Sequence, residues 1–408
     1  MRKIIFLIIL SVFVFSIIYN ISFKSIEKFS TGRISVFLLI TWVIFATKNK
    51  YWKLLFKKQI ILCFVPFPYV IVQFFFATDS IQLSRFTFLF IFSFLGAFLI
   101  AIVSKDTKFL LQVILSSITI QALIIIYSVF NIDYRFWLDS IVVQGGNLSI
   151  IESFRAPGFS NSSGAELSLA QSLGVFTGWL LLNNEEYSIS RTNSIFIITS
   201  MILCAISCIP TGRTGLILTF IFIAIFLLKS SKKLFTLIPI FIITAIIFIV
   251  SNKYIDEFNQ SQFSAEIIYS WAFGFLTGED VTIDNLSKMP IPKISVETFL
   301  GTGLIRNQNG IGNASGHDSG FIQTYYSMGL FFTIIFYIAY FNLLWHINYY
   351  QPWKIRFLLS AIFLILETKE PFVFKYIHMF VLMSIYFSFE IKKLRESKGE
   401  KYENTLRC

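Results

Sequence analysis

Apolar runs about as long as one bilayer crossing recur along almost the whole chain, between shorter polar or charged breaks. A helix that crosses a membrane needs roughly 20 predominantly apolar residues. The pattern therefore predicts an all-α polytopic membrane protein with about 12 transmembrane helices. We expect the spans at about 4–20, 33–47, 59–77, 84–104, 108–130, 165–182, 193–210, 213–228, 233–250, 318–344, 354–367 and 372–390.

Two polar segments, at about 131–164 and 251–317, are much longer than the other breaks. The end of the second segment, from Met289 to Gly316, is rich in glycine and contains prolines, which predicts an irregular loop folded over one end of the helix bundle. We predict one integral membrane domain over residues 1–408, with this long loop before the tenth span.

The Lys and Arg clusters at 48–58, 229–233 and 392–407 all fall on the same side of the membrane when both termini are placed inside. The positive-inside rule favours this orientation. Both long polar segments then lie outside, and residues 391–408 form a cytoplasmic tail. The first apolar run continues to about Tyr19 without a small-residue cleavage site, so we expect an uncleaved first span.

Composition supports the membrane class and excludes others. The chain is 55% hydrophobic and only 14% charged, and its mean hydropathy is +0.72. The net charge of +11 reflects topology, because a nucleic-acid-binding protein would concentrate basic residues on a soluble face. Three of the four cysteines lie in predicted spans and the fourth ends the tail, so we expect neither a disulfide framework nor a metal site.

His317 and Asp318 stand where the long polar segment meets the tenth span. Histidine is rare in this chain, with three copies in 408 residues, and here it lies beside a carboxylate and shortly after Arg306. The grouping predicts a chemical site. A purely structural alternative remains, in which His317, Asp318 or Ser315 caps the span.

Three arginines predicted to face outside lie in glycine- and serine-rich settings. Arg155 precedes the sixth span, Arg213 lies in the hairpin between the seventh and eighth, and Arg306 lies in the long loop. A guanidinium group can grip a phosphate with two hydrogen bonds, and glycine lets backbone amides approach the same anion. The alternative is that each arginine extends to lipid headgroups at the end of its span.

Three segments resemble motifs of the O-antigen polymerase and O-antigen ligase superfamily, whose polymerases are called Wzy. Arg155–Asn161 (RAPGFSN) resembles an R-x-x-G-x-x-N segment, and Thr211–Thr214 (TGRT) resembles a small-residue-plus-Arg-Thr hairpin. His317–Phe321 (HDSGF), followed by Gly329, is similar to the family's H-N-x-x-L…G block. The chain departs from the family pattern at Gly212 (where Ser is common), Asp318 (Asn) and Phe321 (Leu).

The resemblance implies a glycosyltransferase of the bacterial inner membrane that acts at the periplasmic face without a metal or other cofactor. The implied substrate is an undecaprenyl-pyrophosphate-linked oligosaccharide, and membrane lipids and a chain-length regulator are implied partners. His317 would act as base or orienting group for the acceptor hydroxyl, and Arg155, Arg213 and Arg306 would stabilise the pyrophosphate leaving group. We take His317, Arg306 and Arg213 as candidate catalytic residues, and Arg155, Asn161 and Asp318 as candidate substrate-binding residues.

The function expected first is an O-antigen polymerase for lipopolysaccharide biosynthesis, which joins one lipid-linked repeat unit to another. Three alternatives stay open, and one of them is a structural or assembly protein whose loops only bind partners. A ligase of the same superfamily would transfer the glycan to lipid A–core, and a flippase or transporter would move lipid-linked sugars across the membrane. Transporters tend to place ionisable residues at mid-membrane, whereas the candidate residues here lie in outside loops, which favours an enzyme.

Overall fold

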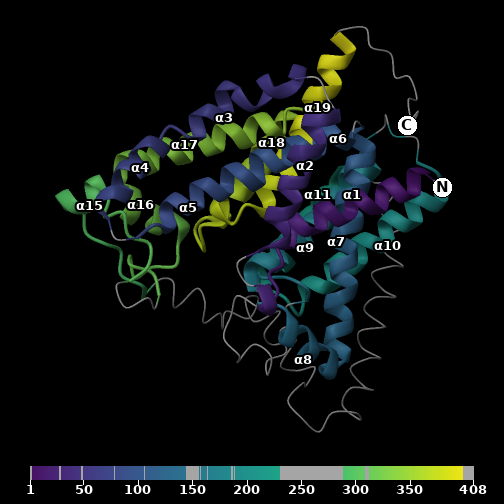
Figure 1. The fold of residues 1–408 in the computed structure, drawn as a ribbon, viewed down its shortest axis with the longest axis horizontal. Coiled ribbons are helices and arrows are strands. Elements are labelled where there is room, and N and C mark those ends of the chain that lie inside the picture. The colour runs from purple at the N-terminus through teal and green to yellow at the C-terminus, as the bar shows by residue number, and fades with distance from the viewer. Residues whose placement is uncertain are drawn as a thin grey trace. The chain divides into compact units, whose positions relative to one another are not determined.

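A computed structural model shows the described residues as helices and the segments that join them, with isolated β-bridges and no β-sheet (Figure 1). The structure describes residues 2–26, 29–46, 49–77, 79–104, 106–143, 156, 158–162, 164–184, 187, 189–229, 288–307 and 312–397.

The helices form two compact units. Unit 1 consists of Met1–Leu39 and Asp106–Glu279, and unit 2 consists of Ile40–Lys105 and Asp280–Cys408. The chain therefore passes from unit 1 to unit 2 within α2 (Thr31–Ala46) and returns after α6 (Ala97–Ser104). The expectation of one integral membrane domain stays a prediction.

Unit 1 is built around a central helix. Its described elements are α1 (Arg2–Tyr19), η1 (Lys24–Ile26), the start of α2, α7 (Thr107–Phe130), α8 (Ile132–Ile141), α9 (Gly164–Asn183), α10 (Arg191–Cys208) and α11 (Arg213–Lys229). Helix α9 packs against α7, α10 and α11, and 89% of its apolar 18-residue stretch is buried within the protein. Burial against other helices explains its serine, glutamine and glycine content, because small and hydrogen-bonding side chains suit close helix packing in a membrane.

Unit 2 is arranged around the C-terminal helix α19. Its described elements are the end of α2, η2 (Asn49–Phe56), α3 (Lys58–Cys63), α4 (Phe67–Phe76), α5 (Ile81–Phe88), η3 (Leu89–Gly96), α6, α15 (Val296–Leu300), α16 (Gly320–Met328), α17 (Leu330–Ile347), α18 (Trp353–Leu366), η6 (Phe372–Lys375) and α19 (Ile377–Ser397). Helix α19 packs on α6 and on η3, which is a π-helical segment between α5 and α6. Ser93 of this segment donates a hydrogen bond to the carbonyl of Tyr376, 3.0 Å away, just before α19 begins.

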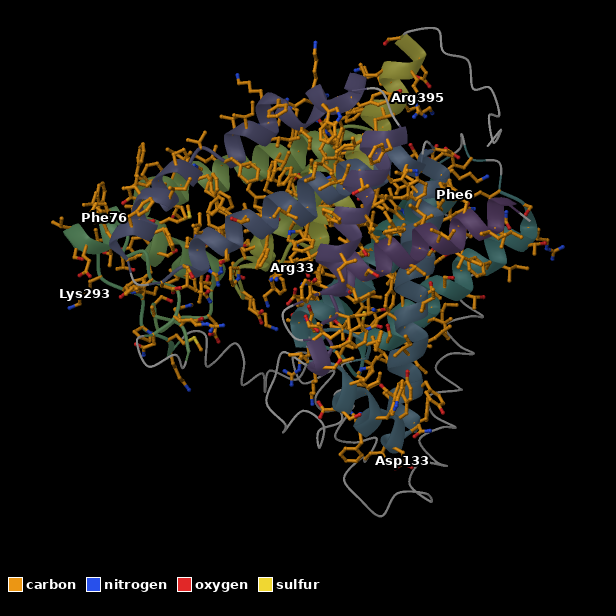
Figure 2. The ribbon with its side chains drawn as sticks, in the orientation of Figure 1. Phe6, Arg33, Phe76, Asp133, Lys293 and Arg395 are labelled. Atoms are coloured by element: carbon orange, nitrogen blue, oxygen red, sulfur yellow. The ribbon has the colours of Figure 1, made fainter. Side chains whose placement is uncertain are left out.

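The two ends of unit 2 carry different chemistry. At one end, Lys57 pairs with Glu390 at 2.5 Å, and the Nε of Arg395 donates to the hydroxyl of Tyr51 at 3.2 Å. Phe76 and Lys293 lie at the other end of the unit (Figure 2). The basic clusters at 48–58 and 392–407, which the sequence predicts on one side of the membrane, thus have members side by side. Which side faces the cytoplasm stays a prediction.

The apolar helices indicate a multi-pass membrane protein. Six described helices are long and apolar enough to cross a membrane: Lys58–Phe76, Ile81–Ser104, Thr107–Phe130, Gly164–Asn183, Arg191–Cys208 and Leu330–Ile347. Three shorter apolar helices coincide with further predicted spans: Ile4–Tyr19, Thr31–Phe45 and Arg213–Ile225. The predicted span 233–250 lies outside the described residues, and the total of about 12 spans stays a prediction.

Some predicted boundaries differ from the structure. The tenth span, predicted at 318–344, is not one helix: α16 stops at Met328, and α17 starts at Leu330. Gly329 between them has φ +83°, a left-handed conformation that ends a helix and suits glycine. The outer segment predicted at 131–164 begins with α8, whose first turn is capped by the Asn131 side chain accepting from the backbone N–H of Tyr134. The predicted tail 391–408 begins as a continuation of α19 to Ser397.

Candidate active site

The glycine-rich loop before α16 is tied to the connection between α4 and α5. The carboxylate of Asp79 accepts hydrogen bonds from the backbone N–H groups of Ile305 at 2.8 Å and Arg306 at 3.0 Å. It also accepts from the N–H of Ile81, at the start of α5. Arg306 and Asn313 form a β-bridge, which brings the loop back toward His317. The Arg306 side chain itself is exposed.

Electrostatics at Asp79 favour its charged form. Burial is the largest single effect and opposes ionisation of this carboxyl. The backbone N–H groups of Arg306, Ile305 and Ile81 and the charge of Arg306 together outweigh burial and hold the pKa of Asp79 below its ordinary value. A charged carboxylate accepting several N–H groups is a strong anchor, because such hydrogen bonds are about twice as strong as neutral ones. The backbone of the loop is therefore fixed at Arg306, while the side chain of Arg306 is exposed.

His317 is 7% exposed and is held from two directions. Its backbone N–H and carbonyl both bond the hydroxyl of Ser315, at 3.3 and 3.1 Å. Its ring nitrogen Nδ1 accepts a hydrogen bond from the backbone N–H of Ser319 at 3.0 Å. The carboxylate of Asp318 is exposed and accepts from the side-chain amide of Asn313 at 2.9 Å. The adjacent carboxylate thus bonds Asn313 instead of the imidazole.

An arginine that the sequence did not single out joins this group. The Nη2 of Arg85, in the second turn of α5, donates to Oε1 of Gln323 at 3.1 Å, and Nε2 of Gln323 donates to the carbonyl of Asp318 at 2.9 Å. The guanidinium carbon lies 5.7 Å from the centre of the Phe374 ring. The available signal was a lone cation at the start of an apolar span, which is costly there and therefore suggests a role.

The buried residue Glu367 bonds the start of α16 through its backbone carbonyl and the turn after α18 through its carboxyl group. Glu367 is 0% exposed, and its carboxyl accepts from the backbone N–H of Val373 at 2.6 Å and from the hydroxyl of Tyr337 at 3.1 Å. Its backbone carbonyl accepts from the N–H of Gly320 at 2.8 Å and from the hydroxyl of Ser319 at 3.3 Å. The turn after α18 therefore positions the residues that directly follow His317.

We call these residues of unit 2 the polar cluster. Its members lie at one end of the unit, on four separate stretches of the chain: Asp79, Arg85, Arg306, His317, Asp318, Gln323 and Glu367. Lys375 and Glu370 pair with each other beside it. His378, the second residue of α19, is fully buried. Its Nε2 lies 2.8 Å from the hydroxyl of Tyr340 and its ring stacks on Phe363, which is a packing role.

The two other sequence motifs meet within unit 1. Arg155 lies outside the described residues, but the N–H of the next residue, Ala156, donates to the carbonyl of Pro210 at 3.0 Å, three residues before Arg213. Arg213 begins α11 and is partly exposed. The hairpin is packed tightly, because a Cβ added to Gly215 would lie 2.0 Å from the carbonyl oxygen of Ser168 in α9.

The side chain of Asn161 bonds Ser22, in the segment that follows α1. Its Oδ1 accepts from the backbone N–H of Ser22 at 2.8 Å, and its Nδ2 donates to the hydroxyl of Ser22 at 2.9 Å. Both ends of the amide are thus used within the protein, which gives Asn161 a structural role in unit 1. Its role in substrate binding stays a prediction.

The structure therefore brings together His317, Asp318 and Arg306 in unit 2, and the Arg155 and Arg213 motifs in unit 1. Among the described residues, no three His, Cys, Asp or Glu side chains lie close enough to hold a metal ion. The exposed guanidinium group of Arg306 suits recognition of an oxyanion such as a phosphate, and His317, although largely buried, lies on the same loop.

Comparison with known proteins adds no relative: no family model matches the chain, and neither a curated protein nor a solved structure is similar to it.

Proposed function

We propose that this protein is a polysaccharide polymerase of a bacterial inner membrane. It would transfer a growing glycan from undecaprenyl pyrophosphate onto another lipid-linked repeat unit at the outer face. The observation that carries the proposal is the position of His317 and Arg306 on one anchored loop at one end of unit 2. The sequence resemblance at His317, Arg213 and Arg155 supplies the reaction class.

The reaction replaces one bond to the anomeric carbon by another. The bond between this carbon and the phosphate oxygen of the donor breaks, and its electron pair leaves with the pyrophosphate. The acceptor hydroxyl oxygen forms the new glycosidic bond and loses its proton to water. Negative charge grows on the departing phosphate, so a fixed guanidinium group near low-dielectric lipid lowers the barrier.

Arg306 is the described arginine best suited to this task in unit 2. Its backbone is fixed by Asp79 while its side chain is exposed, and its guanidinium group makes no hydrogen bond with another residue of the described part. A preorganised backbone with an open cation requires little rearrangement when an anion arrives. The roles implied for Arg155 and Arg213 of unit 1 belong to the same proposal, and each is tested by its own substitution.

Purified protein in liposomes tests the proposal directly. With undecaprenyl-pyrophosphate-linked repeat units, the wild type should produce chains of increasing length. Arg306→Ala, Arg213→Ala, Arg155→Ala and His317→Ala should each slow elongation by about 100-fold or more, as loss of one group that stabilises developing charge does elsewhere. Arg191→Ala, at the exposed start of α10, is the matched control and should elongate normally.

A deletion strain separates the polymerase from its nearest rivals. Loss of a polymerase leaves lipid A–core capped with a single repeat unit, loss of a ligase leaves bare core, and loss of a flippase keeps lipid-linked units on the inner side. A single-unit cap supports the proposal. Bare core, or failure of the units to reach the outer face, would contradict it.

A further inference from the structure

The ring of His317 presents its two nitrogens to different surroundings. Nδ1 accepts the backbone N–H of Ser319 at 3.0 Å. Nε2 makes no hydrogen bond with any residue that the structure describes, and it is not among the buried polar atoms that lack a partner. The ring is thus anchored through Nδ1, and Nε2 retains some exposure although the residue as a whole is only 7% exposed.

The anchor decides which nitrogen carries the proton. A neutral imidazole has one N–H donor and one acceptor nitrogen. An N–H group can only donate, so Nδ1 must be the acceptor and the proton of the neutral ring lies on Nε2. A histidine that serves as general base through Nε2 needs the opposite arrangement, with its Nδ1–H donating to a carboxylate or carbonyl oxygen.

The carboxylates nearby do not supply that arrangement. Asp318 bonds Asn313, Glu367 bonds Val373 and Tyr337, and Glu370 pairs with Lys375. Within the described part of the chain, none of these three carboxylates is hydrogen-bonded to the His317 ring. Nε2 of the neutral ring is therefore a hydrogen-bond donor, and no nearby carboxylate holds the ring in the tautomer that a general base needs.

We propose that His317 binds an anionic phosphate oxygen of the substrate through its Nε2–H, and that it does not take the proton of the acceptor hydroxyl. This inference rests on the proposed function for the identity of the anion, a phosphate of a lipid-linked pyrophosphate. Arg306 lies on the same loop, joined to the His317 segment by the β-bridge to Asn313. One cation and one neutral donor on a single loop fit an oxyanion better than they fit a sugar hydroxyl.

The orientation of the ring is held by α16 and by the turn after α18. Ser319, the N-cap residue of α16, gives its N–H to His317 and its hydroxyl to the carbonyl of Glu367. Gly320 gives its N–H to the same carbonyl. The donor nitrogen is therefore positioned by backbone groups, which keep their polarity at every pH.

Nitrogen NMR on ¹⁵N-histidine-labelled protein in nanodiscs tests the tautomer. The chain has three histidines, and the spectrum of His317→Gln identifies the missing signals. His346 serves as an internal reference, because its Nδ1 lies 2.7 Å from the carbonyl of Asn342 and must donate to it. We expect the proton of neutral His317 on Nε2 and that of His346 on Nδ1. A His317 proton on Nδ1 would overturn the inference.

Binding of farnesyl pyrophosphate tests the role without requiring turnover. A glutamine amide can place an N–H near the position of the imidazole Nε2, whereas an asparagine amide reaches only the region of Nδ1. His317→Ala and His317→Asn should bind the probe about 10- to 100-fold more weakly than the wild type, and His317→Gln should recover most of the loss. His346→Gln is the matched control and should bind normally.

The outcomes separate the inference from the function. Equal binding by His317→Ala and the wild type would overturn the inference even if the tautomer is as expected. Inorganic pyrophosphate, as a second probe, should show the same ranking with lower affinity, and a ranking seen only with the farnesyl probe would contradict phosphate recognition. If both probes behave as expected but liposomes yield no longer chains, the anion site stands and the polymerase proposal fails.

Discussion

The carboxylate of Asp79 accepts the backbone N–H of Arg306 at 3.0 Å, across 227 positions of the chain. The same carboxylate holds Ile305 and the first turn of α5. One side chain in a short connection between two candidate spans thus fixes the base of the longest loop that the structure describes in unit 2. The placement of the exposed Arg306 side chain depends on it.

Removing this carboxylate should loosen the loop without unfolding the helices. Asp79→Ala deletes three hydrogen bonds to a charged acceptor, and we expect a loss of about 1–3 kcal/mol of stability, because the site is partly open to water. Asp79→Asn keeps one acceptor oxygen and should lose less. Thermal unfolding in detergent and protease cleavage within residues 301–307 measure the two effects. Asp133→Ala, at an exposed position of α8, should change neither.

The contribution of Asp79 should depend on pH with a defined sign. Its pKa is lower in the folded protein than the value of about 3.9 in an unfolded chain, so the unfolded state binds the proton more readily. The stabilisation is therefore complete above about pH 5 and is lost as the pH falls through the folded pKa. The difference in melting temperature between wild type and Asp79→Ala should shrink between pH 5 and pH 3. A constant difference over that range would refute the anchor.

Arg85 and Gln323 should be energetically coupled. Arg85 donates to Gln323, which donates to the carbonyl of Asp318, so removing either side chain breaks the hydrogen bond between Arg85 and Gln323. A double-mutant cycle of Arg85→Met and Gln323→Leu should give a coupling of about 1.5–3 kcal/mol, the range for a hydrogen bond to a charged group. Lys354→Met, at the far end of α18, should be additive with Gln323→Leu. Additivity in both cycles would exclude the relay.

Many of the helices could be predicted from the sequence, and the polar cluster could be predicted only in part. Apolar runs predicted helices well where one run makes one helix, as at 108–130 against Thr107–Phe130. The prediction failed at Gly329, because a left-handed glycine breaks a helix without changing the apolar composition around it. Arg85 was missed because its partner lies 238 positions away, and no local pattern reports such a contact.

The sequence also could not assign roles within the His317–Asp318 pair. Adjacent residues often point in different directions, and here the carboxylate bonds Asn313 while the imidazole bonds the backbone of Ser319. Motif spacing predicted that the two residues matter as a group. Only the hydrogen-bond directions distinguish a donor from a base.

The side chain of Glu367 should be essential for the stability of the folded protein. Glu367→Ala would leave the Val373 N–H without its acceptor in a fully buried place, would remove one of the two partners of the Tyr337 hydroxyl, and would open a cavity. We expect a loss of about 3 kcal/mol or more. Glu367→Gln keeps an acceptor oxygen of similar size and should lose about 1 kcal/mol. Chemical denaturation in mild detergent compares the two, and equal losses would mean that the hydrogen bonds contribute little.

Gly215 should tolerate no side chain although it lies in a helix. Alanine favours helix by about 1 kcal/mol over glycine, but a Cβ at Gly215 would lie 2.0 Å from the backbone oxygen of Ser168, which cannot move aside cheaply. Gly215→Ala should therefore lower the folded yield and the melting temperature strongly. Gly178→Ala is the matched comparison, because its Cβ would meet the flexible side chain of Met201. Its loss should be smaller, and the reverse order would contradict the packing described for α9 and α11.

The π-helical segment Leu89–Gly96 determines how α5 is rotated relative to α6 about the helix axis. Its bonds close at i→i+5, so the segment holds more residues per turn than an α-helix does. The faces of α5 and α6 are therefore offset by an angle that depends on how many residues lie between them. Deleting one residue there would barely change the hydropathy of the span, yet it would rotate Arg85 by about 100° away from Gln323. The direction of the Arg85 side chain therefore depends on the number of residues in the π-helical segment. Substitutions keep this number unchanged and would not reveal the dependence.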